Sequence, residues 1–498
     1  MNKDPDNNNM ITVHTGPAAP RVPEAVLFPF DEFAVPFRRG MRLELQSCTR
    51  EGVVIAPGPP GTVDTLRIQY YGTVIRIGDE LRMWYLGIGD REGEDGVAHQ
   101  LKVCYATSRD GVHWEKPELG LVEYGGDSKN NRVLIRGMEE TWIYAAVVLH
   151  EPEDPDPNRR WKMAIEIPDY DGQLAIATSA DGLDWQASPA NPVGPLHEFS
   201  GLTKFNGCYY LAGQGATGYG REMEVLASYD FEHWTMAPAI GLSRKRQGFE
   251  PNRTTNRWIP PVQIPQEREI HIGASLWNRG NVILAVFGDW RWDPRHPGDR
   301  QHVTIDLGLL TSPDAIHYRE PSPDIPLMVS SEQWKTNDDW DSRLIQGQGF
   351  ENIGDKTLFW YMGAKGGVHL ATWPRDRIGG FRMEEHALHP HCSRILGHPH
   401  FITCPITAGT GSARVFLNVD LGNTSHAEVT VELCDEQFRP LPDYSGDNAA
   451  TVAEPGLRVP VKWKATDAVP AKGQPFRIRV NYGGIRTEDV RVFAVYVG

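Results

Sequence analysis

The sequence lacks the features that define several large classes of protein. No stretch approaches the roughly 20 consecutive apolar residues of a membrane-spanning helix, and the mean hydropathy is −0.43. Positive charge is scarce, because 50 Lys and Arg residues stand against 65 Asp and Glu residues, which gives a formal charge of −15. Binding to nucleic acid or to an anionic membrane depends on a basic face. We therefore expect neither of these as a partner.

Cysteine and short catalytic motifs are also sparse. The chain of 498 residues has six cysteines and no CxxC pair, so we expect reduced, mostly buried thiols. It contains no GxSxG, Walker, HExxH or strand-linked GxGxxG motif, so the chemistry of those sites has no support. We expect no cofactor and no metal. The first nine residues, MNKDPDNNN, lack the basic and apolar regions of a secretory signal, so we expect a cytoplasmic protein.

Glycine, proline and aromatic residues are abundant instead. The sequence has 50 Gly and 38 Pro, together with 15 Trp, 16 Tyr and 17 Phe. Glycine and proline favour turns, whereas aromatic residues favour strands. This composition predicts an all-β protein built from many short strands.

One sequence pattern recurs along the middle of the chain. Each copy has a strand that ends in small or hydroxyl residues, a turn on Asp and Gly or their equivalents, and an aromatic residue that opens another strand. This order of residues is typical of a β-hairpin. The copies are YATSRDGVHWEKP (105–117), IATSADGLDW (176–185), LASYDFEHW (226–234), LTSPDAIHYREP (310–321) and the more divergent LATWPRDRIGGF (370–381).

Two further strands precede each hairpin, so that each unit has four strands. Five units of four strands predict a five-bladed β-propeller over residues 27–384, preceded by an N-terminal extension over residues 1–26. After a histidine-rich linker at 385–400, strands of alternating polarity predict an antiparallel β-sandwich over residues 401–498. The bulky strands directly before the hairpins are LRMWYLG (81–87), RWKMAIE (160–166), CYYLAG (208–213), VILAVFGDW (282–290) and TLFWYMG (357–363).

With these hairpins and with C-terminal strands such as FLNVDL and VPVKW, the chain resembles the glycoside hydrolase family 32 and family 43 superfamily of five-bladed propeller furanosidases. The resemblance implies a glycoside hydrolase or transglycosylase that acts on a furanoside-type or related oligosaccharide. It also implies carboxylates in the propeller funnel, because one carboxylic acid must protonate the leaving oxygen while a carboxylate acts from the other face.

The resemblance assigns roles residue by residue. Glu198, in HEFSGLTKFNGCYYLAG, matches the general acid of blade three. In blade one the family's Asp is replaced near Tyr70, and the nearest acid is Asp64. In blade two the family's Arg-Asp-Pro is absent, so Glu140 is the candidate acid there. Tyr70 and Trp142 stand where the family has acids, and we expect them to contact substrate.

Polar and aromatic residues of blades four and five add further candidates. A carboxylate beside Arg and Trp suits a sugar subsite, because aromatic faces stack on sugar rings and bidentate groups hold hydroxyls. Asp341 is therefore a second-line catalytic candidate. The expected substrate contacts are His271, Asn278, Arg279, Trp340, Arg343, Gln346 and Glu351.

Two other functions stay open. The missing acids of blades one and two would suit a non-catalytic carbohydrate-binding propeller. A propeller enzyme that cleaves sugars by phosphorolysis would need cations around an anion, and Arg253, Arg257 and His271 could supply them. In each case the expected partner is a small oligosaccharide or glycoside, and a homo-oligomer is an open possibility.

Overall fold

The structure is a computed structural model. It describes residues 9–90, 101–167, 171–217, 220–243, 268–293, 295–296, 302–323, 325–330, 343–363, 366–388, 398–409, 413–422, 424–470 and 473–498.

The described part of the chain is built from β-strands, which confirms the expected all-β class. It contains no α-helix; its helical elements are four single 3₁₀ turns. None of its helical segments is long and apolar enough to cross a lipid bilayer. The 3₁₀ turns are η2 (Pro157–Arg159), η7 (Glu385–Leu388), η8 (Pro442–Tyr444) and η9 (Gly446–Asn448).

Five units follow one another along the middle of the chain, and their strands pair antiparallel except for one parallel pair in the second unit. The first unit comprises β7 (Arg67–Ile77), β8 (Glu80–Ile88) and β9 (Lys102–Ser108). The second comprises β10 (Leu134–Arg136), β11 (Ala145–His150), β12 (Trp161–Glu166), β13 (Leu174–Ser179) and β14 (Asp184–Ala187). The third comprises β15 (Glu198–Phe205), β16 (Cys208–Thr217), β17 (Gly220–Ser228) and β18 (Ala239–Leu242). The fourth comprises β19 (Arg268–Asn278), β20 (Ile283–Trp292) and β21 (Val303–Ser312). The fifth comprises β22 (Ile345–Ile353), β23 (Lys356–Met362), β24 (Val368–Pro374) and the early strand β6 (Thr49–Ile55).

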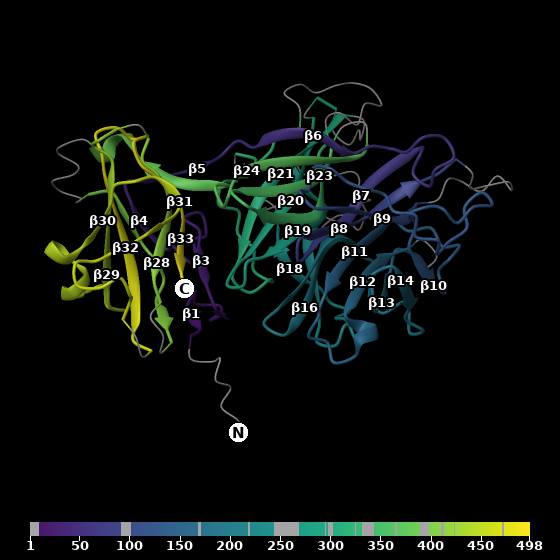
Figure 1. The fold of residues 1–498 in the computed structure, drawn as a ribbon, viewed down its shortest axis with the longest axis horizontal. Helices are drawn as coiled ribbons and strands as arrows, with labels where there is room; N and C mark the ends of the chain where they lie inside the picture. The colour runs from purple at the N-terminus through teal and green to yellow at the C-terminus, as the bar shows by residue number, and fades with distance from the viewer. Residues whose placement is uncertain are drawn as a thin grey trace, which may run out of the picture.

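The strands β7, β11, β15, β19 and β22, which we call the inner strands, contact one another in a ring. The ring closes between the fifth and first units, where β22 and β7 pair in parallel at Gln348 and Thr73. Strand β6 then pairs with β24, so a segment from before the first unit completes the fifth. Figure 1 shows these units together in one half of the molecule.

In four of the five hairpins a Ser and an Asp hold the turn closed. In the first unit Ser108 Oγ accepts a hydrogen bond from the N–H of Gly111, and Asp110 Oδ1 accepts from the N–H groups of Val112 and His113. The prediction that these Asp residues form turns is therefore confirmed. Equivalent contacts occur at Ser179 and Asp181, at Ser228 and Asp230, and at Ser312 and Asp314.

The turn carbonyl of Gly111 also joins neighbouring units. It accepts one hydrogen bond from the indole of Trp114 in its own turn and another from the indole of Trp360 on β23, both at 2.9 Å. The carbonyl of Gly182 accepts two indole hydrogen bonds in the same way, one of them from the first unit. The aromatic residues of the repeat thus fasten one unit to the next.

Four inner strands contain a bulge close to their first residues. A bulge takes backbone N–H and C=O groups out of the ladder, and such buried groups need other partners. Side chains of neighbouring units supply them. The contacts between units at these bulges are Leu202 N–H to Gln348 Oε1, Ile272 N–H to Gln214 Oε1 (2.6 Å), and Gln346 Nε2 to the carbonyls of His271 (2.8 Å) and Gly273 (2.9 Å). Thr73 Oγ1, beside the bulge of β7, accepts from the N–H of Val148 (2.9 Å) on β11, which has no bulge.

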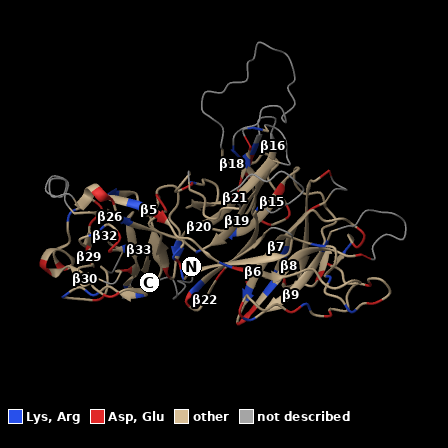
Figure 2. Cartoon of the chain, turned by 90° about the horizontal axis from the view of Figure 1, so that it is seen from above, with Lys and Arg blue, Asp and Glu red and all other residues tan. Residues whose placement is uncertain are grey.

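Both ends of the chain contribute to two further antiparallel sheets, which share one apolar core. In Figure 1 they form the other half of the molecule, and Figure 2 shows charges of both signs over both halves. One sheet has β1 (Ile11–Val13), β2 (Arg21–Val22), β4 (Phe37–Arg39), β26 (His400–Ile402), β27 (Ile406–Ala408), β29 (Glu428–Cys434), β30 (Ala450–Val452) and β32 (Pro475–Gly483). The other has β3 (Ala25–Leu27), β5 (Met41–Leu45), β25 (Gly379–Met383), β28 (Val415–Asp420), β31 (Gly456–Pro460) and β33 (Arg491–Val497).

These pairings cross the boundary expected at residue 27. Strands β1 to β5 lie on both sides of that residue, yet all of them pair within the C-terminal sheets. The buried carboxylate of Asp376 ties the two halves together, because it pairs with Arg279 of the fourth unit and accepts a hydrogen bond from Tyr496 of β33. The early part of the chain thus anchors the ring to the C-terminal sheets before β6 completes the fifth unit.

The turn geometry predicts that a side chain at position 111 strongly lowers the free energy of unfolding. Gly111 has φ +78°, and a Cβ there would lie 2.6 Å from Trp360 Cζ2. Gly120 has a similar φ of +71° but open space around it. We expect Gly120→Ala to lower the free energy of unfolding by about 1 kcal/mol through backbone strain alone. Gly111→Ala should lower the free energy of unfolding by about 1–3 kcal/mol more than Gly120→Ala does, because the added methyl group overpacks the turn. Denaturant titration of both variants checks this, and equal losses would contradict it.

Candidate active site

The first residues of the inner strands lie at the same end of the ring, which we call the entry end. Asn278 near the end of β19 donates to the carbonyl of Lys204 near the end of β15, so these two strands run in parallel. Glu198 is the first residue of β15. Glu166, the last residue of β12, pairs with Ala145, the first residue of β11. The two glutamates therefore belong to the same end of neighbouring units.

Glu166 is a buried carboxyl group, with 6% of its surface exposed. Side chains alternate along a strand, and Ala164 packs in the apolar cluster shared with the third unit, so Glu166 lies on that face. Burial and the like charge of Glu198 raise the pKa of Glu166 to about 9. Because this value is above neutral pH, Glu166 carries a proton under ordinary conditions.

Glu198 is half-buried and has a fixed partner. The side-chain amide of Gln214, directly opposite on β16, donates a hydrogen bond to Glu198 Oε2. An amide donor stabilises the negative charge of a carboxylate. The entry end thus holds one protonated carboxyl group and one carboxylate that accepts a hydrogen bond.

Tyr71 of β7 lies among the charges of this end. Burial raises the pKa of its hydroxyl, and the negative charges of Glu198 and Glu166 raise it further, whereas Arg67 and Arg221 act in the opposite direction. The first, second and third units thus each contribute groups that interact with one phenol. We call Arg67, Tyr71, Glu166, Glu198 and Arg221 the entry cluster.

An aromatic pair lies next to the entry cluster. The rings of Trp142 and Tyr144 meet edge to face with centroids 5.2 Å apart. The N–H of Tyr144 donates to the carbonyl of Glu166 at 2.8 Å, and 36% of Tyr144 is exposed. Partly exposed aromatic rings beside carboxyl groups suit a ligand with apolar ring faces and polar edges.

Asp64 is built into the scaffold. It is 1% exposed, forms an ion pair with Lys116 at 2.5 Å and accepts a hydrogen bond from Tyr85 at 2.7 Å. Thr62 and the N–H of Gly58 donate to its other oxygen. With protein donors on both oxygens, Asp64 stabilises the loop before β7.

Three expected residues are buried near the entry end. Tyr70 is 0% exposed and packs against Gly347 and Gly349 of β22, so the structure gives it no surface for a ligand. Gln346 is also 0% exposed, and its amide holds the bulge of β19. His271 is 8% exposed, and its ring stacks on Trp290 at 5.5 Å between centroids.

Three other expected residues lie at the opposite end of the ring. Asn278 and Arg279 follow the last part of β19, where Arg279 pairs with Asp376. Glu351 lies in the second half of β22, with its carboxylate 4.0 Å from Arg76. This placement corrects the expectation that they open onto the same funnel as Glu198. Their distance along the strand from the bulge puts them at the other end.

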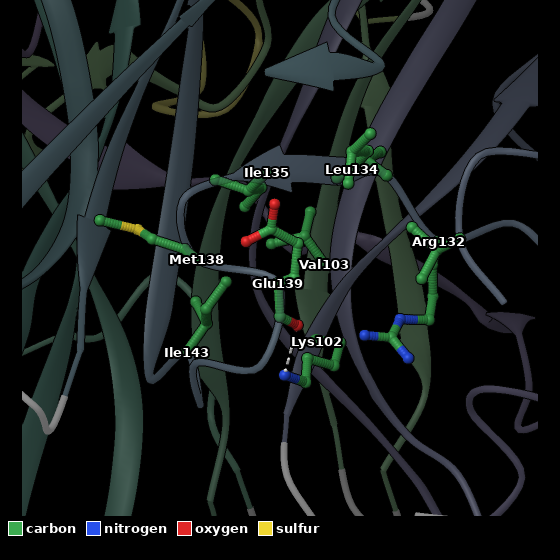
Figure 3. A pocket seen from close by; sticks show the side chains of 10 residues that line it. Lys102, Val103, Arg132, Leu134, Ile135, Met138, Glu139 and Ile143 are labelled. Atoms are coloured by element: carbon green, nitrogen blue, oxygen red, sulfur yellow. Dashed lines mark hydrogen bonds between the residues drawn. The ribbon is translucent and has the colours of Figure 1, made fainter. Parts of the chain in front are cut away.

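Glu140 is exposed in the loop between β10 and β11. Beside its loop is an enclosed cavity of about 30 Å³. Figure 3 shows Lys102 at this cavity, with its ammonium group donating to the carbonyl of Glu139 at 3.0 Å. The volume is about that of one water molecule, so this cavity cannot hold a sugar.

Trp340 and Asp341 lie outside the described residues, as do Arg253 and Arg257. Arg343 is half-buried and forms a parallel bridge with Ile305 of β21. Within the described ranges, no group of three His, Cys, Asp or Glu side chains is arranged to hold a metal ion.

Sequence reasoning missed Glu166, Tyr71, Arg67 and Arg221. Glu166 closes the strand segment RWKMAIE, and a carboxylate that ends an otherwise apolar strand was the signal available. Tyr71 was missed by one position, because the bulge between Gln69 and Thr73 interrupts the alternation that would separate it from Tyr70.

Comparisons with known proteins leave the chain without an assigned family. No family model matches it. Two uncharacterized proteins of Mycobacterium tuberculosis are 29% and 28% identical over 164 residues, which is 30% of this chain and 48% of each of theirs. The match thus spans about half the length of these curated relatives.

Several solved structures can be superimposed on about two thirds of this chain. A structure reported for the GH130 family of mannoside phosphorylases is 14% identical with a TM-score of 0.45, covering 67% of this chain and 95% of that one. A glycosyl hydrolase from Bacteroides ovatus is 15% identical with a TM-score of 0.43, covering 67% and 94%. The catalytic domain of a Coprinopsis cinerea GH62 α-L-arabinofuranosidase is 12% identical with a TM-score of 0.38, covering 66% and 97%. With TM-scores below 0.5, none of them assigns a fold or an activity to this chain.

The raised pKa of Glu166 predicts a pH-dependent stability. Between its ordinary value of 4.5 and about 9, the unfolded chain releases a proton that the folded chain keeps. The free energy of unfolding therefore falls as pH rises through this window, by at most about 1.4 kcal/mol per pH unit from this group. Glu166→Gln lacks this contribution, so its stability relative to the wild type should increase between about pH 5 and pH 8. Urea titrations across this range measure the difference, and parallel curves would contradict it.

Proposed function

We propose that the ring of five units is a five-bladed β-propeller and that the two C-terminal sheets form a β-sandwich. The closed contacts of the inner strands and the single core shared by the two sheets support this architecture. We further propose that residues 11–45 belong to the sandwich, because their strands pair there.

We propose that the protein is a glycosidase or transglycosylase whose reaction takes place at the entry cluster. The observation that carries this proposal is the buried carboxyl group of Glu166, whose pKa burial and Glu198 raise to about 9, at the same end of the ring as Glu198. Cleavage of a glycosidic bond needs one carboxylic acid and one carboxylate, because the transition state resembles an oxocarbenium ion. A furanoside-type or related oligosaccharide is the substrate that we propose.

The glutamates and arginines of the entry cluster and the neighbouring aromatic pair each have a role in this proposal. Glu166 donates its proton to the glycosidic oxygen as the bond from that oxygen to the anomeric carbon breaks. Glu198 acts from the other face, either by forming a bond to this carbon or by taking a proton from a water molecule whose oxygen attacks it. This assignment reverses the role of general acid that the resemblance implies for Glu198. Trp142 and Tyr144 would contact a sugar ring, and Arg67 and Arg221 would bind its hydroxyl groups.

We expect Glu166→Gln and Glu198→Gln each to lower kcat by about 10²–10⁴-fold, the usual effect of losing a catalytic acid or base. A panel of nitrophenyl glycosides and fructans, assayed with the wild type first, identifies the substrate for this test. Glu140→Gln is the matched control, because Glu140 is an exposed glutamate outside the entry cluster. Full activity of Glu198→Gln on the identified substrate would overturn the proposal.

A non-catalytic carbohydrate-binding protein is the second candidate. The contacts of Asp64 favour this function. Asp64 is the acid nearest the family's blade-one position, but its carboxylate already binds Lys116 and Tyr85. Calorimetric binding of an oligosaccharide without turnover, weakened by Tyr144→Ala, would support this function instead.

A further inference from the structure

Gln214 connects Glu198 to the next unit of the ring. It is 7% exposed, and both ends of its amide are occupied. Its nitrogen donates to Glu198 Oε2, and its oxygen accepts the N–H of Ile272 on β19 at 2.6 Å. Since an amide has one oxygen and one nitrogen, these two contacts fix which way it points.

The peptide that holds Gln214 is itself held in an unusual conformation. Ile272 has φ +49° and Gly273 has φ +73°, inside the bulge between His271 and Ala274. A β-branched residue rarely adopts positive φ, so the surroundings must impose it. Close packing is part of this constraint, because a Cβ on Gly273 would lie 2.4 Å from Gly213 Cα.

Hydrogen bonds from two other units complete the support of this bulge. Ser200 of β15 donates to the carbonyl of Ile272 at 2.9 Å. The amide of Gln346 donates to the carbonyls on either side, those of His271 and Gly273. The amide oxygen of Gln214 therefore accepts a hydrogen bond from a peptide that residues of the third, fourth and fifth units hold in place.

We propose that Gln214 is a positioning residue that holds the carboxylate of Glu198 in a fixed orientation. This inference rests on the proposed function of Glu198. The charged and titratable groups that interact at this end are Glu166 from β12, Arg67 and Tyr71 from β7, and Arg221 from β17. Of the hydrogen bonds described, the one from Gln214 is the contact that orients Glu198 directly.

Two substitutions separate the two contacts of Gln214. Gln214→Met keeps the length of the side chain and removes both hydrogen bonds. Gln214→Glu keeps an acceptor for the N–H of Ile272 but replaces the donor to Glu198 with a second carboxyl group. Ser200→Ala is the matched control, because it weakens the same bulge without removing a contact to Glu198.

We expect Gln214→Met to lower kcat by about tenfold or more with KM changed less than about threefold, because orientation acts on the transition state. Loss of the donor should move the acidic limb of the pH–rate profile upward by about one pH unit, and the like charge in Gln214→Glu should move it further. Ser200→Ala should lower the melting temperature without moving this limb. Circular dichroism confirms that each variant is folded.

A measurement without substrate keeps the inference separate from the proposed function. Carbon-13 labelling of glutamate carboxyl groups, with the Glu198 signal assigned by its loss in Glu198→Gln, follows the titration of Glu198 directly. A higher titration midpoint in Gln214→Met than in the wild type supports the role of Gln214, and an unchanged midpoint overturns it. If Glu198→Gln keeps full activity, the proposed catalytic function fails, and the midpoint still decides whether Gln214 holds this carboxylate.

Discussion

The structure depends on satisfying the backbone groups that the bulges leave unpaired at the centre of the ring. An inner strand with a bulge has N–H and C=O groups that no neighbouring strand of its own unit reaches. Gln214, Gln346 and Gln348 supply partners to backbone groups at or beside these bulges, and Thr73 supplies one to Val148 of the unbulged β11. Each of these side chains bonds to a different unit from its own. The same contacts that satisfy these groups therefore join the units, so the ring is held at its centre as well as at its turns.

This constraint also decides which polar residues are free for chemistry. Gln346 and His271 are at the entry end, where a sugar contact was expected, but the central bulges bury both of them. Asp64 is likewise occupied by Lys116 and Tyr85. The two carboxyl groups of the entry cluster are carried by strand termini, outside the bulges. Glu198 begins one inner strand, and Glu166 ends the strand that pairs with another.

The sequence predicted the strands well because their signals are local. The Ser and Asp of each hairpin act within a few residues of one another, and the bulky strands expected at 81–87 and 357–363 are β8 and β23. The pairing of β1 to β5 with the C-terminal sheets could not be predicted, because it joins residues hundreds of positions apart. Prediction of the site was limited by the bulges. They change which side chains alternate along a strand, and no residue pattern in the sequence indicates where they occur. They separate Tyr70, which is buried, from Tyr71, which interacts with both glutamates.

Three buried carboxyl groups show how partners, rather than burial alone, set the character of an acid. Asp376 is 1% exposed, and although burial works to raise its pKa, Arg279, Asn352 and Tyr496 together hold that pKa below its ordinary value. Asp64 is equally buried and has Lys116 as its counter-ion. Both serve the scaffold, because protein donors occupy both oxygens of each carboxylate. Glu166 is buried beside another carboxyl group instead, and its pKa rises to about 9. An acid that keeps its proton at neutral pH next to a carboxylate is suited to donating it, which is why the entry cluster, and not the larger number of buried acids, defines the candidate active site.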